Sequence, residues 1–219
     1  MKSIFVSFLI MILAVDLSAQ AAEPDTVPFR PNVTLGYEVA GQVLRFLYPE
    51  RKGHSLSLSF EWQPHLMAAI EAGTSGVDIK KPSHIYSSSG GFLKAGINYN
   101  LLQKRPDLKG NQIFLLMRYG FGFLTHEAPL IVINDGYWGE ASVSFEKANF
   151  LAHWAEIGGG LRTRLFGNFF IGWDVRLRLM MARNHGSELN PYYIGGFGRN
   201  HNNSSVGFQY FIFYKFPVK

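Results

Sequence analysis

The strongest constraint on the fold is a long two-armed pattern between Ala152 and Met181. In each arm, apolar residues alternate with polar or small ones, and this period of two is the signature of a β-strand. Gly167-Asn168 between the arms is a tight-turn signal. Each arm has roughly a dozen residues or more, about twice the usual strand. Since about 9–11 tilted residues cross a bilayer, we predict two strands of a transmembrane barrel, apolar outside and charged inside.

Six further segments alternate in the same way. They are residues 32–40, 53–62, 66–72, 90–101, 111–124 and 204–216. With the two arms of the hairpin they predict an all-β fold, an eight-stranded antiparallel transmembrane β-barrel of the outer-membrane type over residues 32–216. The alternative is a soluble, lipocalin-like barrel, which would turn its apolar faces inward.

The connections between these segments alternate in length. The long ones are 41–52, 73–89, 125–151 and 182–203, and the short ones are 63–65, 102–110 and 167–168. Outer-membrane barrels have long extracellular loops and short periplasmic turns. The order of the connections therefore predicts that the N- and C-termini of the barrel are periplasmic.

The first 21 residues have the features of a cleaved secretory signal peptide. Lys2 precedes the largely apolar stretch Ile4–Val15, and Ala19-Gln20-Ala21 is a small-residue cleavage site. Residues 22–31 hold three prolines and predict a short periplasmic lead, and 217–219 overhang the last strand. The chain has no cysteine, so disulfides and thiolate metal sites are excluded.

Composition agrees with a membrane barrel. Aromatic residues make up 15% of the chain, and 23 glycines supply small residues for a crowded interior. The formal net charge of +5 does not indicate a nucleic-acid binder, because many of the basic residues alternate with apolar ones inside candidate strands. We assign this charge to the lumen and, at the rim, to contact with anionic lipopolysaccharide.

The last strand ends in an aromatic alternation formed by Phe208, Tyr210, Ile212, Tyr214 and Phe216. It resembles the C-terminal signature that the barrel assembly machinery receives, which makes that machinery an expected partner. An ordinary aromatic strand is the alternative, since Phe211 and Phe213 occupy the opposite face and blur the pattern.

Several phrases of the chain resemble one family. They are Arg118-Tyr119-Gly120-Phe121, Tyr137-Trp138-Gly139, the stretch 153–178, and Ser205-Val206-Gly207-Phe208 leading to YFIFYKFP. They are similar to a Bacteroidetes family of outer-membrane β-barrel proteins that is known only as a domain of unknown function. The resemblance implies an outer-membrane barrel and brings no activity, ligand or catalytic residue.

Charged residues of both signs fall on the predicted inner faces. They are Glu38, Glu61, Glu71, Lys94, Arg118, Glu156, Arg162, Arg164, Asp174, Arg176 and Arg178, with Lys215 in the last strand. An eight-stranded barrel is just wide enough for side chains to fill it, and buried charges must be paired. We therefore predict a salt-bridge network that packs the lumen. A narrow polar channel, or an anion site built on the arginines, is the alternative.

Histidines in or beside the long connections are the candidate metal ligands. They are His126, His153, His185 and His201. Imidazoles bind zinc or copper, but no tight His-x-x-x-His spacing is present, so the pattern favours unrelated polar loop residues over a metal site.

A hydrolase would need a base within reach of a hydroxyl, with an acid that orients the base. The candidates are His185 with Ser187, and His201 with Ser204. Lipid A deacylases of eight strands use such a His-x-Ser pair, but their acid comes later in the chain. Here no acidic residue follows Glu188, so the sequence does not favour an enzyme.

Together these patterns predict a small, non-enzymatic barrel in the outer membrane.

We expect the lumen of this barrel to be packed, and its extracellular loops to contact lipopolysaccharide, a ligand or an envelope partner. We expect a monomer without cofactors that binds no nucleic acid. A narrow channel is the second interpretation and a lipid-modifying hydrolase at the rim is the third.

Overall fold

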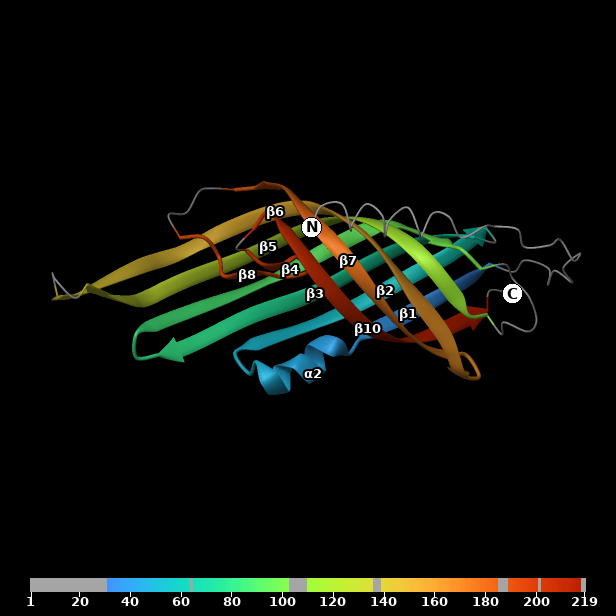
Figure 1. Cartoon of the computed structure of the whole chain (residues 1–219), viewed down its shortest axis with the longest axis horizontal. Coiled ribbons are helices and arrows are strands. Elements are labelled where there is room, and N and C mark those ends of the chain that lie inside the picture. Colours follow the sequence, from blue (N-terminus) through green and yellow to red (C-terminus); the bar gives the residue numbers. More distant parts are fainter. Residues whose placement is uncertain are drawn as a thin grey trace, which may run out of the picture.

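The computed structural model describes residues 31–63, 65–102, 110–135, 139–184, 189–200 and 202–217. These residues form a closed barrel of eight antiparallel strands in the order β1-β10-β7-β6-β5-β4-β3-β2 (Figure 1). The strands are β1 Asn32–Glu38, β2 Arg51–Gln63, β3 Leu66–Lys81, β4 His84–Asn100, β5 Gln112–Asp135, β6 Gly139–Phe166, β7 Phe169–Arg183 and β10 Ser204–Pro217. Strand β10 closes the ring by pairing with β1, so the predicted eight-stranded antiparallel barrel is confirmed.

The barrel is apolar outside and polar inside. On β5, Met117 and Tyr119 point outward and are more than half exposed, whereas Arg118 between them is buried. The same alternation holds on β4, where Leu93 is exposed and Lys94 is fully buried. A water-soluble barrel has the opposite distribution, so this wall is suited to hydrocarbon. The lipocalin-like alternative is therefore wrong.

The two ends of the barrel differ. Strands β2 and β3, and strands β6 and β7, are joined by short turns at one end, where β1 begins and β10 finishes. We call this the turn end. At the opposite, loop end lie the turn Pro82–Ser83, the helix α2 (Ala40–Leu47) and the long connection from β7 to β10.

Two of the four predicted long loops are wrong. Residues 73–89 continue β3 and β4 up to the tight turn Pro82–Ser83. Residues 125–151 extend β5 and β6, which have 24 and 28 residues, to a connection at 136–138 that lies outside the described residues. These four strands form a tall wall on one side of the loop end (Figure 1). The wall rises beyond the length that crosses a bilayer, and its apolar residues Val77, Tyr86 and Ala128 form a small buried cluster there.

The connection from β7 to β10 folds into the mouth of the barrel. Its residues 189–200 include a two-stranded hairpin, β8 (Tyr193–Ile194) and β9 (Gly198–Arg199). Ile194 and Phe197 are fully buried against Phe92, Leu124 and Trp154 of the barrel wall. We call residues 189–200 the plug.

The remaining predicted segments fall mostly outside the structure. The signal peptide at 1–21, nearly all of the lead at 22–31, and residues 218–219 lie outside the described residues. No helix in the described ranges is long and apolar enough to cross a membrane.

Glycines on the inner face make room for large side chains. A Cβ atom added at Gly120 would lie 2.4 Å from the ring of Trp154, which is fully buried and cannot move aside. Gly159 shares the outer face of β6 with the exposed Ile157, and a Cβ atom added there would find only ordinary contacts, the nearest at 3.4 Å. The interior is therefore filled at the level of Trp154.

We predict that Gly120→Ala lowers the free energy of unfolding by about 1–3 kcal/mol, the usual cost of overpacking. Gly159→Ala is the matched control and should leave it nearly unchanged. Both are measured by urea unfolding in detergent, followed by the heat-modifiable gel mobility of the barrel. Equal stability of the two variants would contradict this account of the interior.

Candidate functional site

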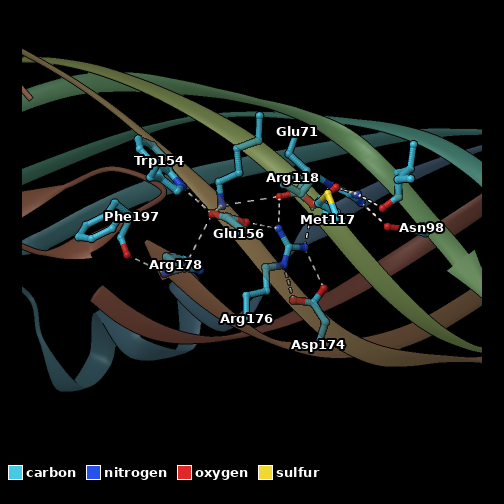
Figure 2. Close-up of polar contacts among 12 residues, drawn as sticks. Glu71, Asn98, Met117, Arg118, Trp154, Glu156, Asp174, Arg176, Arg178 and Phe197 are labelled. Carbon is cyan, nitrogen blue, oxygen red and sulfur yellow. Dashed lines mark hydrogen bonds and ion pairs between the residues drawn. The ribbon is translucent and has the colours of Figure 1, made fainter. Parts of the chain in front are cut away.

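The centre of the lumen is a network of ion pairs around Arg176. Its guanidinium donates two hydrogen bonds of 2.7 Å to the carboxylate of Glu71, from the opposite side of the barrel. It also donates to Asp174 at 2.6 and 2.9 Å and to Glu156 at 3.1 Å. Figure 2 shows Arg176 between these carboxylates. One cation thus joins β3, β6 and β7 across the lumen.

Lys94 and Arg178 extend the network toward the loop end. The Lys94 ammonium lies 2.9 Å from Glu156 Oε1 and 3.8 Å from Glu71 Oε2, and Arg178 Nε lies 3.3 Å from the same Glu156 oxygen. Trp154 Nε1 donates to Glu156 Oε1 at 2.8 Å. Glu156 therefore interacts with three cations and an indole, all in a region closed to solvent.

Arg118 of β5 connects the network to strand β4. Its Nε lies 3.7 Å from Glu71 Oε1, and its other nitrogens donate to the Ile97 carbonyl at 2.7 Å and to Asn98 Oδ1 at 2.5 Å. The network therefore contains four cations and three carboxylates. Pairing of this kind is required because an unpaired charge in such an interior is very costly.

A second, smaller cluster lies nearer the turn end. Glu61 accepts a hydrogen bond from Asn32, and its carboxylate lies 3.9 Å from Lys215 Nζ. Arg162 stacks on the ring of Phe213 with 3.9 Å between the guanidinium carbon and the ring centroid. This cluster narrows the lumen below the central network.

The plug covers the network from the loop end. Arg178 donates a hydrogen bond of 2.9 Å to the carbonyl oxygen of Phe197, and the Phe197 ring packs edge-on against Trp154 with 5.7 Å between centroids. Gly196 and Gly198 on either side adopt positive φ angles of 76° and 118°, a conformation that favours glycine. The turn they make carries Phe197 into the barrel.

Two cavities lie at the loop end. The larger, of about 870 Å³, is bounded by the tall wall and the plug, and its lining includes Ile79, Tyr86, Ile131, Leu189 and Tyr192. This volume is within the range of small-molecule sites. The smaller, of about 190 Å³, lies between α2, β2 and β10, with Arg178 at its inner side.

The structure joins seven of the predicted lumen charges in the central network. They are Glu71, Lys94, Arg118, Glu156, Asp174, Arg176 and Arg178. Glu61 and Arg162 belong to the smaller cluster. One assignment is wrong: Arg164 is exposed and donates to the Gly167 carbonyl in the β6–β7 turn, because β6 already leaves the lumen there. Glu38 lies at the edge of the network, half-buried at the end of β1, where it interacts electrostatically with Lys94 and Arg178 and accepts a hydrogen bond from Gly41 of α2.

The two candidate histidines that the structure describes do not come together. His126 is buried inside the barrel beside Tyr86 and Phe150, whereas His153 is on the outer face, where its Nδ1 lies 2.5 Å from the Tyr119 hydroxyl. His185 and His201 lie outside the described residues. In the described ranges, no group of three or more His, Asp or Glu side chains is placed to hold a metal ion.

The candidate catalytic pairs cannot be assembled from the described part of the chain. His185, Ser187 and His201 lie outside it, and Ser204 is exposed at the start of β10. The polar groups that do converge are paired carboxylates and cations, an arrangement that holds strands together and fills space.

Two features of the site were not predicted from the sequence. One is the plug, since Gly195-Gly196-Phe197-Gly198 indicates only a flexible loop tip by composition. A signal was present: an aromatic residue framed by glycines can turn inward. The other feature is the cavity beside α2.

Comparison with known proteins identifies the family. The whole chain, residues 1–219, matches the family described as Domain of unknown function (DUF6048), and the protein belongs to it. No curated protein shows significant similarity to the chain.

Three solved structures are similar at low levels. The chain is 11% identical to Ail, the attachment invasion locus protein of Yersinia pestis, with 87% of this chain and 100% of that one covered and a TM-score of 0.41. The chain is 9% identical to the N-terminal β-barrel domain of Pseudomonas aeruginosa OprF, with 85% of this chain and 98% of that one covered and a TM-score of 0.39. It is 9% identical to Neisserial surface protein A, with 86% of this chain and 96% of that one covered and a TM-score of 0.38. Because all three TM-scores are below 0.5, these similarities add no evidence about the fold or function of this protein.

We predict that Arg176→Gln lowers the free energy of unfolding by about 3–5 kcal/mol, because it leaves buried carboxylates without their shared cation. Lys80→Gln removes a cation whose side chain is 75% exposed in its pair with Asp78, and should change the free energy by about 0–1 kcal/mol. Urea unfolding of both variants in the same detergent measures the difference. A small effect at Arg176 would show that the network is dispensable.

Proposed function

We propose that this DUF6048 protein is a small outer-membrane β-barrel that does not conduct and that binds its partners at the loop end. Support for the membrane comes from the outer wall, where apolar side chains such as Leu56, Ile157 and Leu177 are exposed on every side. Apolar surface of this extent is unfavourable in water. A closed sheet is also the form in which β-strands can span a bilayer, because it has no open edge.

The closed lumen carries the functional proposal. Arg176 bonds to carboxylates on three strands at the centre, the fully buried Lys94 lies beside it, and the plug covers both. Water and ions would have to displace paired charges to pass. This favours a binding or structural barrel over the narrow channel of the second interpretation.

We further propose that the loop end is extracellular and that both barrel termini are periplasmic. Strand β1 begins and β10 finishes at the turn end, and short turns are periplasmic in outer-membrane barrels. The expected partners are lipopolysaccharide, a ligand or an envelope protein at the loop end, and the assembly machinery at β10. The loop-end cavity of about 870 Å³ has room for a ligand. The Bacteroidetes origin, a signal peptide and a monomeric state stay predictions.

The conductance of the barrel tests the central claim. We expect the purified protein in planar bilayers to give no reproducible conductance steps. A triple variant, Glu71→Ser with Lys94→Ser and Arg176→Ser, removes the centre of the network and should give small steps if it folds, as judged by gel mobility. Steady channels from the unchanged protein would replace this proposal with the narrow channel.

The orientation can be tested because the chain has no native cysteine. A membrane-impermeant maleimide added to intact cells should label Lys80→Cys, near the tip of the β3–β4 hairpin, and should not label Asn168→Cys in the β6–β7 turn. Both variants should react after the cells are lysed. Labelling of Asn168→Cys alone in intact cells would reverse the proposed orientation.

A further inference from the structure

The barrel wall has a seam at the loop end. Strand β1 has only seven residues and ends at Glu38, where it is paired with Phe211 of β10. Beyond that level no strand of the described chain separates β2 from β10. Residues Arg51–Ser55 of β2 pair only with β3, and Ser204–Gln209 of β10 pair only with β7. Two strand edges therefore face each other without hydrogen bonding.

Helix α2 covers this seam from outside and packs against both β2 and β10 (Figure 1). Gln42 of the helix donates a hydrogen bond of 2.7 Å to the carbonyl oxygen of Gly53 on the open edge of β2. The helix thus replaces part of the missing strand. An open edge needs such a partner, since unsatisfied backbone groups are costly beside lipid.

The cavity of about 190 Å³ lies in the seam and contains polar atoms without partners. Within the described part of the chain, Ser55 Oγ and Gln209 Oε1 find no hydrogen-bond partner although both residues are more than nine-tenths buried, and Arg51 Nε finds none there either. The space is enough for about six water molecules. Buried polar atoms of this kind are normally satisfied, so the cavity is suited to a polar group that supplies their bonds.

The cavity is lined with an excess of cations. Arg45, Arg51, Lys52 and Arg178 contribute to its lining, against a single carboxylate, Glu38, which already caps the backbone of Gly41. Arg178 is committed to Glu156 and Phe197, and Arg51 lies among the rings of Tyr48, Tyr192 and Tyr193.

Two of these cations have no partner within the described ranges. Neither Arg45 nor Lys52 forms an ion pair there. The nearest other acid in the sequence, Glu50, lines the other cavity. The free charge of the seam therefore favours an anion.

Apolar surface continues from the cavity to the outside of the barrel. Phe208 lines the cavity and is 58% exposed on the outer face of β10. Val43, Phe46 and Leu47 of α2, the helix that packs against β2 and β10, are also exposed, with Phe46 at 88%. A short helix with an apolar face and an arginine on its other side has the character of an element that lies at a membrane interface.

We propose that the seam is a binding site for a membrane lipid with a phosphate in its headgroup. The phosphate lies in the cavity with Arg45, Lys52 and Ser55, and the acyl chains run along Phe208 and the apolar side of α2. A lipid suits the site better than free phosphate does, because the anion site and the apolar surface are continuous. This inference rests on the proposed membrane location and identifies one class of partner for the loop end.

The test uses the full-length protein in dodecylmaltoside and three probes in isothermal titration. Dioctanoyl phosphatidic acid carries both phosphate and chains, dioctanoylglycerol carries the chains alone, and inorganic phosphate carries the anion alone. We expect phosphatidic acid to bind at least about tenfold more tightly than either of the others.

Substitutions locate the site. The double variant Arg45→Gln/Lys52→Gln should weaken phosphatidic acid binding by about 30-fold, because one cation near an anionic lipid surface is worth about a factor of five. Ser55→Ala should weaken it by about tenfold through the loss of a hydrogen bond to a charged group. The control Lys80→Gln/Lys81→Gln removes two cations of the β3 tip and should have no effect. Gel mobility verifies that each variant is folded.

The outcomes are distinct. Inorganic phosphate binding as tightly as phosphatidic acid would make the seam a site for free anions and overturn the proposal, and so would equal binding of dioctanoylglycerol. An equal loss in the Lys80/Lys81 control would show general charge attraction, and absence of binding would also refute the site. The bilayer conductance is independent of these titrations, so a failed lipid site and a failed closed-barrel proposal can be told apart.

Discussion

Charge pairing inside a closed wall is the condition on which this barrel depends. Its outer surface is apolar, so the charged side chains at the level of the central network turn inward, where water is excluded. Arg176 satisfies carboxylates on three strands, and Lys94, Arg118 and Arg178 satisfy what remains. Replacing any one of them leaves a buried charge unmatched. The lumen is thus occupied by the contacts that hold it together, and little of it is left for transport.

Backbone hydrogen bonding imposes a second condition, and the seam is where the strands alone do not meet it. Because β1 ends at Glu38, the edges of β2 and β10 separate above it, and a helix with one well-placed glutamine takes over. The same shortening of β1 leaves a small polar cavity behind the helix. A local defect in the sheet therefore produces a part of the wall that combines unpaired polar groups with an excess of positive charge.

The fold could be predicted from the sequence to the extent that the membrane imposes alternation. Strands such as β5 reveal themselves where one face meets lipid and the other meets charges, and the inner positions of Lys94, Glu156 and Arg176 follow from that period. Beyond the bilayer the constraint disappears. Residues 73–81 and 84–89 pair as regular strands, yet their glycines, serines and lysines interrupt the apolar alternation, so by composition they resemble a loop. Alternation reports burial, and strand pairing can continue without it.

The details of the site depend on contacts between segments distant in the sequence, which periodicity does not encode. No local pattern indicates that Phe197 will pack on Trp154, or that Glu38 will accept a hydrogen bond from the backbone of α2. Arg164 shows a different limit. It lies on the same side of β6 as the buried Arg162, but the strand has already left the lumen at Arg164. The alternation in the sequence predicts whether a residue faces inward or outward. Its position along the barrel axis decides which residues it contacts. The sequence does not predict these positions along the axis, because the strands differ widely in length, from seven residues in β1 to 28 in β6. That same inequality creates both the tall wall and the seam, so the features least visible in the sequence are the ones that make the loop end suited to binding.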